Sequence, residues 1–281
     1  MDRSIARRMW HGLEPIHAGV YFAPDARAKY EAVGLKGYWM GYFASRSAAM
    51  GTPSAELVMA TFYNFSERSV RRAIPDAWRF STPERVLEAR LELAEETTHH
   101  LAGNPALALA AQLAGSAARS ARPEGHPLFA AHATLPWPDT AHLRLWHAAT
   151  LLREHRGDGH VAVLITNGAD GFEAHVLSAA AGNVEIEGQK RHRGITEEEW
   201  AGATDRLRDR GFVDADGVFT PEGRAFKQAI EERTDELALP PYEAIGEEAC
   251  ERLLTSLDAL STRDAMPYPN AMGLRRPAAA P

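Results

Sequence analysis

Histidine and glutamate recur in two segments that are otherwise rich in aromatic residues. The segment MWHGLEPIH (Met9–His17) contains His11, Glu14 and His17, and LWHAATLLREH (Leu145–His155) contains His147, Glu154 and His155. Imidazole and carboxylate groups exchange protons near neutral pH and bind transition metals. The first two histidines are six positions apart with Pro15 between them, and two helical turns separate the second pair, so neither pair alone forms a metal site on one helix face.

A pocket lined by both segments is the stronger chemical hypothesis. Each segment places a tryptophan directly before its first histidine, and GYWMGY (Gly37–Tyr42) adds a cluster of aromatic side chains. Apolar walls with a few convergent polar groups are typical of small-molecule sites. The residues predicted to bind a ligand are Trp10, His11, Glu14, His17, Tyr38, Trp39, Tyr42, Trp146, His147 and His155.

The same histidines have other possible roles. Their side chains could cap helices or bond backbone carbonyls, and in the pocket they could coordinate a metal or haem or act as acid and base. His99 and His100 are expected to interact favourably with a helix C-terminus. The sequence identifies no catalytic residue, metal or cofactor.

Two further segments have the layout of DNA-reading helices. The first, FSERSVRRAIPDAW (Phe65–Trp78), carries Arg68, Arg71 and Arg72, which suit phosphate and guanine contacts. The second, ITEEEWAGATDRLRDRG (Ile195–Gly211), opens with three glutamates that would repel phosphates, although they also complement the helix dipole. The residues predicted to bind DNA are Arg68, Arg71 and Arg72, assisted by Arg191 and Arg193.

Composition limits the class of protein. The 281 residues carry a net charge of −7, which gives no overall attraction to nucleic acid or to anionic membranes. The single cysteine, Cys250, excludes an intrachain disulfide framework and a Cys-rich zinc site. No phosphate loop, dinucleotide fingerprint or nucleophile elbow is present. Without a signal-peptide pattern or a membrane-length apolar run, we expect a cytoplasmic location.

The elements that would position these residues recur in order along the chain. FSTPERVLEARLELAEE (Phe80–Glu96), for example, matches FTPEGRAFKQAIEERTDE (Phe219–Glu236), and several such matches keep an offset near 136 residues. This pattern predicts a tandem duplication. The expected units are a first half over residues 1–121, a Pro-rich connector over 122–144, a second half over 145–261 and a flexible tail over 262–281.

The second half shows clear local signals. Thr196 and Glu199 form a capping box at a helix start, and Gly211 is typical of a helix end. GFVDADGVFT (Gly211–Thr220) predicts a small hairpin around an Asp-Gly turn, before a helix that begins at Pro221. The Gly-Asp-Gly sequence within EHRGDGH (Glu154–His160) predicts a turn, with an anion-binding loop as the alternative.

This order of elements resembles MarR-type regulators. In those proteins RLxxRGLV ends the recognition helix, a wing follows, and LTxxGR opens a long dimerisation helix, as in DRLRDRGFVDADGVFTPEGRAF (Asp205–Phe226). The chain also resembles an actinobacterial helix-turn-helix family of undefined activity, through Leu145–His160. The resemblance implies a mainly α fold with a small β-wing, in which a tandem winged helix-turn-helix forms an intrachain MarR-like pseudo-dimer.

Together, these features predict a MarR-like, small-molecule-responsive transcriptional regulator with asymmetric or weakened DNA binding. The expected partners are a small molecule held between the halves and, as a further candidate, DNA. The protein would be a monomer that acts as a pseudo-dimer, with its two halves in place of two subunits. The alternative is an enzyme, or a cofactor- or metal-binding protein, that has lost DNA binding on the same scaffold and uses a His/Glu-lined central pocket.

Overall fold

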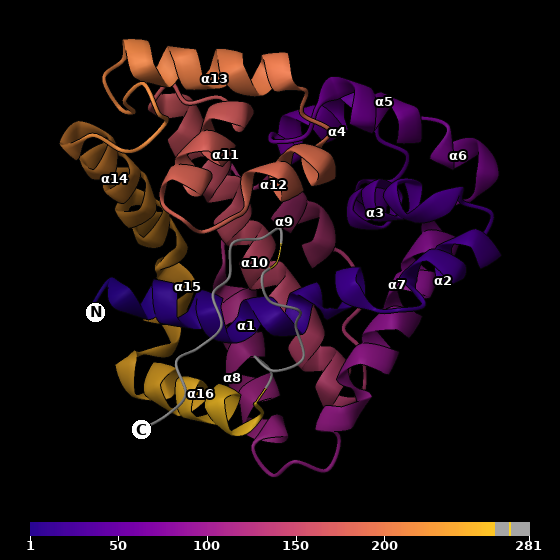
Figure 1. Cartoon of the computed structure of the whole chain (residues 1–281). Coiled ribbons are helices and arrows are strands. Elements are labelled where there is room, and N and C mark those ends of the chain that lie inside the picture. The colour runs from indigo at the N-terminus through magenta and orange to yellow at the C-terminus, as the bar shows by residue number, and fades with distance from the viewer. Residues whose placement is uncertain (262–269, 271–281) are drawn as a thin grey trace.

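The computed structural model describes residues 1–261 and Asn270, and its regular elements are all helical (Figure 1). The α-helices are α1 (Ser4–Phe22), α2 (Ala26–Ala32), α3 (Gly37–Ser47), α4 (Ala55–Phe62), α5 (Glu67–Ala73), α6 (Ala77–Phe80), α7 (Pro83–Thr98), α8 (Leu107–Ser120), α9 (Pro127–Ala133), α10 (Ala141–Thr166), α11 (Gly171–Ala180), α12 (Ile186–Arg193), α13 (Glu197–Asp209), α14 (Pro221–Ala238), α15 (Pro240–Ile245) and α16 (Glu247–Ala259). Two 3-10 turns, η1 (Ala48–Met50) and η2 (His99–Leu101), follow α3 and α7.

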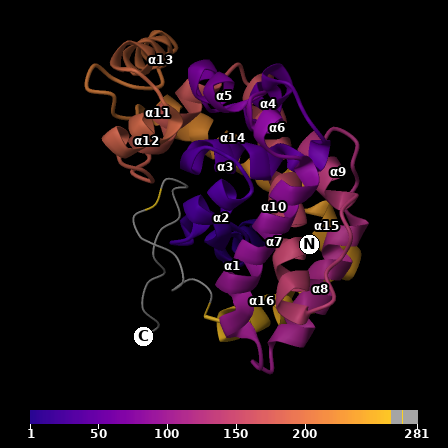
Figure 2. The ribbon, with the colours of Figure 1, turned by 90° about the vertical axis from the view of Figure 1, so that its right-hand side faces the viewer.

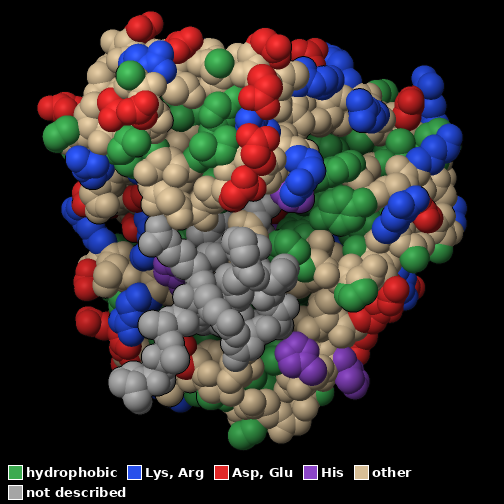
Figure 3. Space-filling model, in the orientation of Figure 1, with side chains coloured by type: hydrophobic (Ala, Val, Ile, Leu, Met, Phe, Trp, Pro, Cys, Tyr) green, Lys and Arg blue, Asp and Glu red, His purple; other side chains and the backbone are tan. Residues whose placement is uncertain are grey.

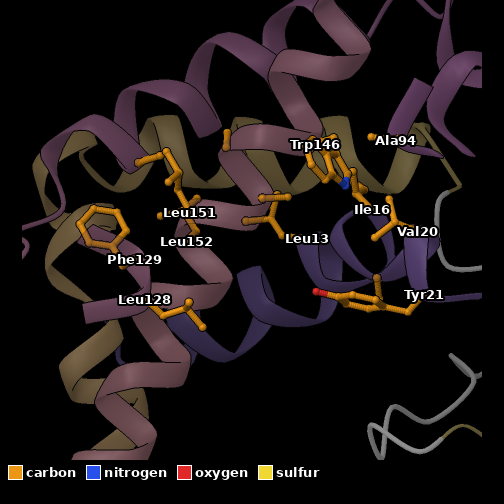
Figure 4. Close-up of a cluster of buried hydrophobic side chains, with 14 of the residues drawn as sticks. Leu13, Ile16, Val20, Tyr21, Ala94, Leu128, Phe129, Trp146, Leu151 and Leu152 are labelled. Carbon is orange, nitrogen blue, oxygen red and sulfur yellow. The ribbon is translucent and has the colours of Figure 1, made fainter. Parts of the chain in front are cut away.

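Helix α10 is the central element. Its 26 residues span about 39 Å at the usual rise per residue. It packs against α1, α7, α8, α9 and α14, so it is apolar on more than one side (Figure 1). Leu151 and Leu152 of α10 face Leu13 of α1 and Phe129 of α9 in the core (Figure 4). None of the described helices is long and apolar enough to cross a membrane.

The core consists of two hydrophobic clusters joined by α10. The larger cluster contains side chains from α1, α3, α7, α8, the first half of α10, and α15 and α16. The smaller one contains Val163 and Leu164 from the end of α10, with Leu177, Leu207 and Ile230 from α11, α13 and α14. The predicted division into two halves remains a prediction. The predicted tail lies outside the described residues, except for Asn270.

The turn predicted at Gly157-Asp158-Gly159 is wrong, because α10 continues through it. A Cβ atom on Gly159 would lie 3.4 Å from the Leu237 Cβ atom and 3.5 Å from the His126 Cε1 atom, so α14 and the segment before α9 lie directly against this glycine. The Asp158 carboxylate accepts hydrogen bonds from the backbone N–H groups of Leu128 and Phe129, each at 2.9 Å. Tertiary packing therefore overrides the local turn signal.

The predicted β-wing is also wrong, and with it the winged tandem fold and the MarR-like pseudo-dimer built on it. The described residues form no strand or sheet, only one isolated antiparallel bridge between Val213 and Phe219. The Asp214 carboxylate accepts hydrogen bonds from Asp216 N and Val218 N, which closes a tight turn. The Thr220 N–H donates to the Phe212 carbonyl at 3.1 Å and the Asp214 N–H donates to the Val218 carbonyl at 2.9 Å, and these two bonds make up the single bridge. The fold is an all-helical helix-turn-helix arrangement.

The predicted helix signals around this loop are confirmed. Thr196 and Glu199 form the capping box, with the Glu199 N–H donating to Thr196 Oγ1 at 3.1 Å and the Thr196 N–H donating to Glu199 Oε2 at 2.9 Å. Helix α14 begins at Pro221 with Thr220 as its cap. Gly194 adopts a left-handed conformation, φ +68°, between α12 and α13.

We predict that acid destabilises this fold well above the usual range of carboxylate titration. Burial lowers the pKa of His132, His147 and His155 to about 4 and that of His175 to about 3. These imidazoles regain a pKa of about 6.5 on unfolding, so between about pH 6.5 and 4 the unfolded chain binds more protons. The free energy of unfolding therefore falls as pH is lowered through this window.

Asp158 and Glu14 act in the opposite sense, because burial raises their pKa, to about 7 for Asp158, but the histidines whose pKa is lowered outnumber them, since burial also lowers the pKa of His160 to about 4. Thermal unfolding followed by circular dichroism at pH 7, 6 and 5 measures the balance. An unchanged or rising Tm toward pH 5 would show that these histidines are not held neutral.

We predict a contrast between two glycines of α10. Leucine at Gly159 would overlap with Leu237 and His126, and should lower the free energy of unfolding by about 1–3 kcal/mol. At Gly157 a Cβ atom would come no closer than 3.8 Å to Glu154 Oε2 and 3.9 Å to Arg153 Nη1, so leucine there starts from an uncrowded position and gains helix propensity. Urea denaturation of G159L and G157L compares them, and equal midpoints would contradict the close packing described for Gly159.

Candidate functional site

A cavity of about 520 Å³ opens between α3 and α12 and reaches the end of α1 and the middle of α10. Figure 3, which has the orientation of Figure 1, shows exposed hydrophobic side chains between the positions of α12 and α3. The cavity is lined by Tyr21, Phe22, Tyr38, Trp39, Tyr42, Phe65, Arg153, Val184, Glu185, Gly188, Gln189, Arg191, His192, Arg193 and Asn270.

One wall of the cavity is aromatic because α3 carries aromatic residues at successive positions and at helical spacing. Tyr38 and Tyr42, four residues apart, stack with ring centroids 6.4 Å apart, and the Tyr42 ring lies 5.1 Å from that of Tyr21. Trp39 meets Phe65 edge-on at 6.3 Å. The Tyr38 hydroxyl donates to the Tyr21 carbonyl at 2.9 Å, and burial raises the pKa of this phenol. These contacts form a rigid surface for a planar apolar group.

Guanidinium groups adjoin the aromatic wall. The Arg193 guanidinium lies 4.4 Å from the centre of the Phe65 ring, in a cation–π contact. Arg153 enters from α10 and donates from Nη1 to Glu154 Oε2 at 2.8 Å. Arg46 of α3 donates to both oxygens of the same carboxylate, at 3.0 and 2.9 Å. The fully buried Glu154 thus fixes two arginines behind and beside the cavity.

Positive charge exceeds negative charge in this region. Burial alone would raise the pKa of Glu154, but Arg153 and Arg46 hold it well below its usual range. Burial opposes ionisation of Tyr42 as well, yet Arg46, Arg193 and Arg153 together lower the pKa of its phenol. The surroundings therefore favour negative charge at the cavity wall.

Two more groups complete the charge distribution. Burial raises the pKa of Glu14, the second buried carboxyl near Arg153, so it supplies less negative charge than an ordinary carboxylate. Glu185 lines the cavity, but its carboxylate accepts hydrogen bonds from the Glu187 and Gly188 N–H groups at the start of α12. Glu14 therefore offsets the arginines less than an ordinary carboxylate would, whereas Glu185 contributes one negative charge to the cavity lining.

Three of the predicted ligand residues line the cavity: Tyr38, Trp39 and Tyr42. Others lie behind it on α1. Glu14 accepts a hydrogen bond from Trp10 Nε1 at 3.1 Å, and His17 Nδ1 lies 3.0 Å from Thr150 Oγ1 in the core. His11 is exposed, beside Trp10.

The predicted residues of α10 are distributed along the core rather than gathered at one pocket. His147 meets Trp137 edge-on at 4.8 Å, and His155 stacks on His126 at 3.9 Å. Trp146 is buried with the Arg90 guanidinium 5.5 Å from its ring. The structure therefore brings together the three predicted aromatic residues of α3, but neither the predicted tryptophans of α1 and α10 nor the histidines.

Arg153 and His192 were missed as cavity residues, and Arg191 and Arg193 were predicted to bind DNA instead. The cluster RHR (Arg191–Arg193) is recognisable in the sequence as basic, but only the packing of α12 against α3 shows that it lines the cavity. Arg153 has one sequence signal, its position directly before the buried Glu154. A lone arginine in an amphipathic helix is usually solvated, so this signal is weak.

The two candidate recognition helices contact each other. Helices α5 and α13 lie next to each other along one edge of the molecule in both views (Figures 1 and 2). Arg68 of α5 donates to both Glu199 oxygens, at 3.0 and 2.6 Å, and to the Gly194 carbonyl at 2.6 Å. The Ser66 N–H donates to the Arg193 carbonyl at 3.1 Å. One of the glutamates that would repel phosphate thus pairs with an arginine that would attract it.

Other basic groups nearby are paired as well. Arg71 donates to Glu67 at 2.6 Å and to Glu56 at 2.8 Å. Lys190 donates to both oxygens of Glu197 at 2.8 Å. Arg72 is exposed and, within the described part of the chain, forms no ion pair. Surface ion pairs are weak and exchangeable, but each reduces the positive potential that DNA would meet.

Comparison with known proteins identifies one family. A family model described as "Helix-turn-helix family" matches residues 6–266, which is most of the chain. No curated protein and no solved structure matches. With its all-helical fold and its match over nearly the full length, the chain belongs to this helix-turn-helix family.

Proposed function

We propose that this protein is a small-molecule-binding regulator of the helix-turn-helix family, whose ligand is a planar aromatic anion and whose contact with DNA is weakened and asymmetric. The observation that carries the proposal is the cavity between α3 and α12, with an aromatic wall from Tyr38, Trp39 and Tyr42 and guanidinium groups from Arg153 and Arg193. Its volume is within the usual range for small-molecule pockets.

The chemistry of the two walls supports the ligand class. Stacked and edge-on aromatic rings favour a flat apolar body, and arginine binds carboxylates through paired N–H donors. The lowered pKa of Tyr42 indicates that this wall stabilises negative charge. A neutral molecule of the same shape would leave the excess positive charge uncompensated, so charge as well as shape should determine affinity.

The position of the cavity supports a regulatory role. It is bounded by α12, which leads directly into α13, and Arg193 at its wall also accepts the Ser66 N–H through its carbonyl. A ligand that contacts Arg193 would therefore act beside the contact between α5 and α13. The resemblance of Asp205–Phe226 to MarR-type regulators adds support. Ion pairing of Arg68 and Arg71 supports weakened DNA contact, with Arg72 as the exposed cation.

We predict that the protein binds 2-naphthoate more tightly than 2-naphthamide, which has nearly the same shape but no charge. Replacing Arg193 with glutamine should weaken naphthoate binding about 10-fold or more and leave naphthamide binding nearly unchanged, since a hydrogen bond to a charged group contributes about 1.5–3 kcal/mol. Quenching of tryptophan fluorescence, to which Trp39 at the cavity contributes, or calorimetric titration measures both affinities.

The matched control is Arg72→Gln, which removes the same charge from an exposed site outside the cavity. It should not change naphthoate binding. Equal affinity for naphthoate and naphthamide, or a charge preference that survives in the Arg193 variant, would remove the anion-binding part of the proposal.

We predict that releasing Arg68 strengthens DNA binding. The variant Glu199→Gln keeps a side chain able to complete the capping box but removes the charge that pairs with Arg68. Its affinity for a duplex from the gene's own upstream region should rise, and the slope of log affinity against log salt should steepen by about 0.9 if Arg68 gains one phosphate contact.

The matched control is Glu222→Gln, which makes the same charge change at an exposed first-turn glutamate of α14. Fluorescence anisotropy over a salt series compares both variants with the unmodified chain. Identical salt slopes in E199Q and E222Q would show that Arg68 contacts no phosphate. If the unmodified chain and E199Q both bind naphthoate but show no salt-sensitive DNA binding, the regulatory role itself fails and a ligand-binding protein without DNA contact replaces it.

A further inference from the structure

A second cluster of ligating groups lies where the end of α7 meets the start of α10. Glu95 lies between two histidines: its Oε1 atom is 2.9 Å from His99 Nδ1, and its Oε2 atom is 2.7 Å from His142 Nε2. One ligand atom from each residue can be chosen so that all three lie within 4.8 Å of one another. None of these residues lines the aromatic cavity.

The local structure explains why the three side chains meet. Glu95 and His99 are four residues apart at the end of α7, so they project from the same side of the chain. Thr140 precedes the first turn of α10, and its hydroxyl lies 3.4 Å from His142 Nε2. The His142 side chain is 8% exposed, whereas that of His99 is 71% exposed. One histidine is thus held by packing and the other can adjust.

We propose that Glu95, His99 and His142 form a binding site for a divalent transition-metal ion, with Zn²⁺ as the best-matched ion. Two imidazole nitrogens and one carboxylate oxygen are ligands that Zn²⁺ accepts, at bond lengths of about 2.0–2.2 Å. Ligands in a tetrahedral site of this size lie about 3.3 Å apart. A small movement of the exposed His99 brings the three atoms to that spacing, and water completes the coordination on the exposed side.

The charge state of the cluster is consistent with this assignment. Hydrogen bonds from His142 and then His99 lower the pKa of Glu95, so its carboxylate is ionised at neutral pH. The rings of the two histidines lie edge-to-face with centroids 5.7 Å apart, which leaves both imidazoles turned toward the carboxylate. A simple ion-pair cluster accounts for the same hydrogen bonds, so metal binding itself is the discriminating measurement.

The site would have a structural effect. It would tie the end of α7 to the start of α10, the helix that joins the two hydrophobic clusters. A metal ion that binds only the folded chain raises the free energy of unfolding, and this increase grows with the logarithm of the metal concentration.

The experiment is calorimetric titration of the full chain, without a histidine tag, with Zn²⁺, together with the visible absorption of the Co²⁺ complex. The variants are His99→Ala and Glu95→Gln, and His100→Ala is the matched control because it removes an adjacent exposed histidine outside the cluster. His99 is exposed, so its loss leaves the core intact; circular dichroism checks the fold of each variant.

We expect one Zn²⁺ per chain and a Co²⁺ complex whose visible absorption is as intense as that of an ion with a low coordination number. The affinity should fall at least about 10-fold in H99A and E95Q but not in H100A. Binding that is absent in the unmodified chain, that does not reach a defined stoichiometry, or that is unchanged in H99A and E95Q would overturn the assignment. Loss of affinity in H100A to the same degree would place the metal on a surface histidine pair instead and would equally overturn it.

Discussion

The structure around the cavity depends on one buried carboxylate. Glu154 is completely enclosed and is held by Arg46 from α3 and Arg153 from its own helix. A charge in this position is tolerated only because both oxygens are paired, and removing one partner of such a pair typically costs about 3–5 kcal/mol. The same contacts fix α3 against α10. They therefore set the distance between the aromatic wall and the arginines.

This arrangement links the core to the candidate ligand site. Arg46 also lies with its guanidinium 4.3 Å from the Phe62 ring, and its carbonyl accepts a hydrogen bond from His132. Each of these groups is buried, so a change in one is transmitted to its neighbours through packing and charge rather than through solvent. The positive potential at the cavity is thus a consequence of how the core is built, with Tyr42 and Arg193 at its exposed end.

Local signals in the sequence predicted local structure well. The capping box at Thr196 and the helix start at Pro221 depend on residues within four positions of each other, and both are confirmed. The aromatic cluster GYWMGY predicted Tyr38, Trp39 and Tyr42 as ligand-binding residues; these three line the cavity, and their binding of a ligand stays a prediction.

Features that depend on distant parts of the chain were not predictable in this way. Gly159 continues a helix because Leu237 and His126 pack against it, which its own neighbours in sequence do not indicate. Arg68 has a partner 131 residues away, so a basic helix and an acidic helix that look like competing DNA surfaces form one contact. The hairpin signal at Asp214–Val218 produced a turn with a single bridge, because the chain enters α14 at Pro221 instead of continuing as a strand.

Anomalous diffraction from crystals soaked with 6-bromo-2-naphthoate tests the central claim most directly. We predict a bromine peak between α3 and α12 with the carboxylate at Arg193 or Arg153, and a bromine site elsewhere, or none at saturating ligand, would contradict it.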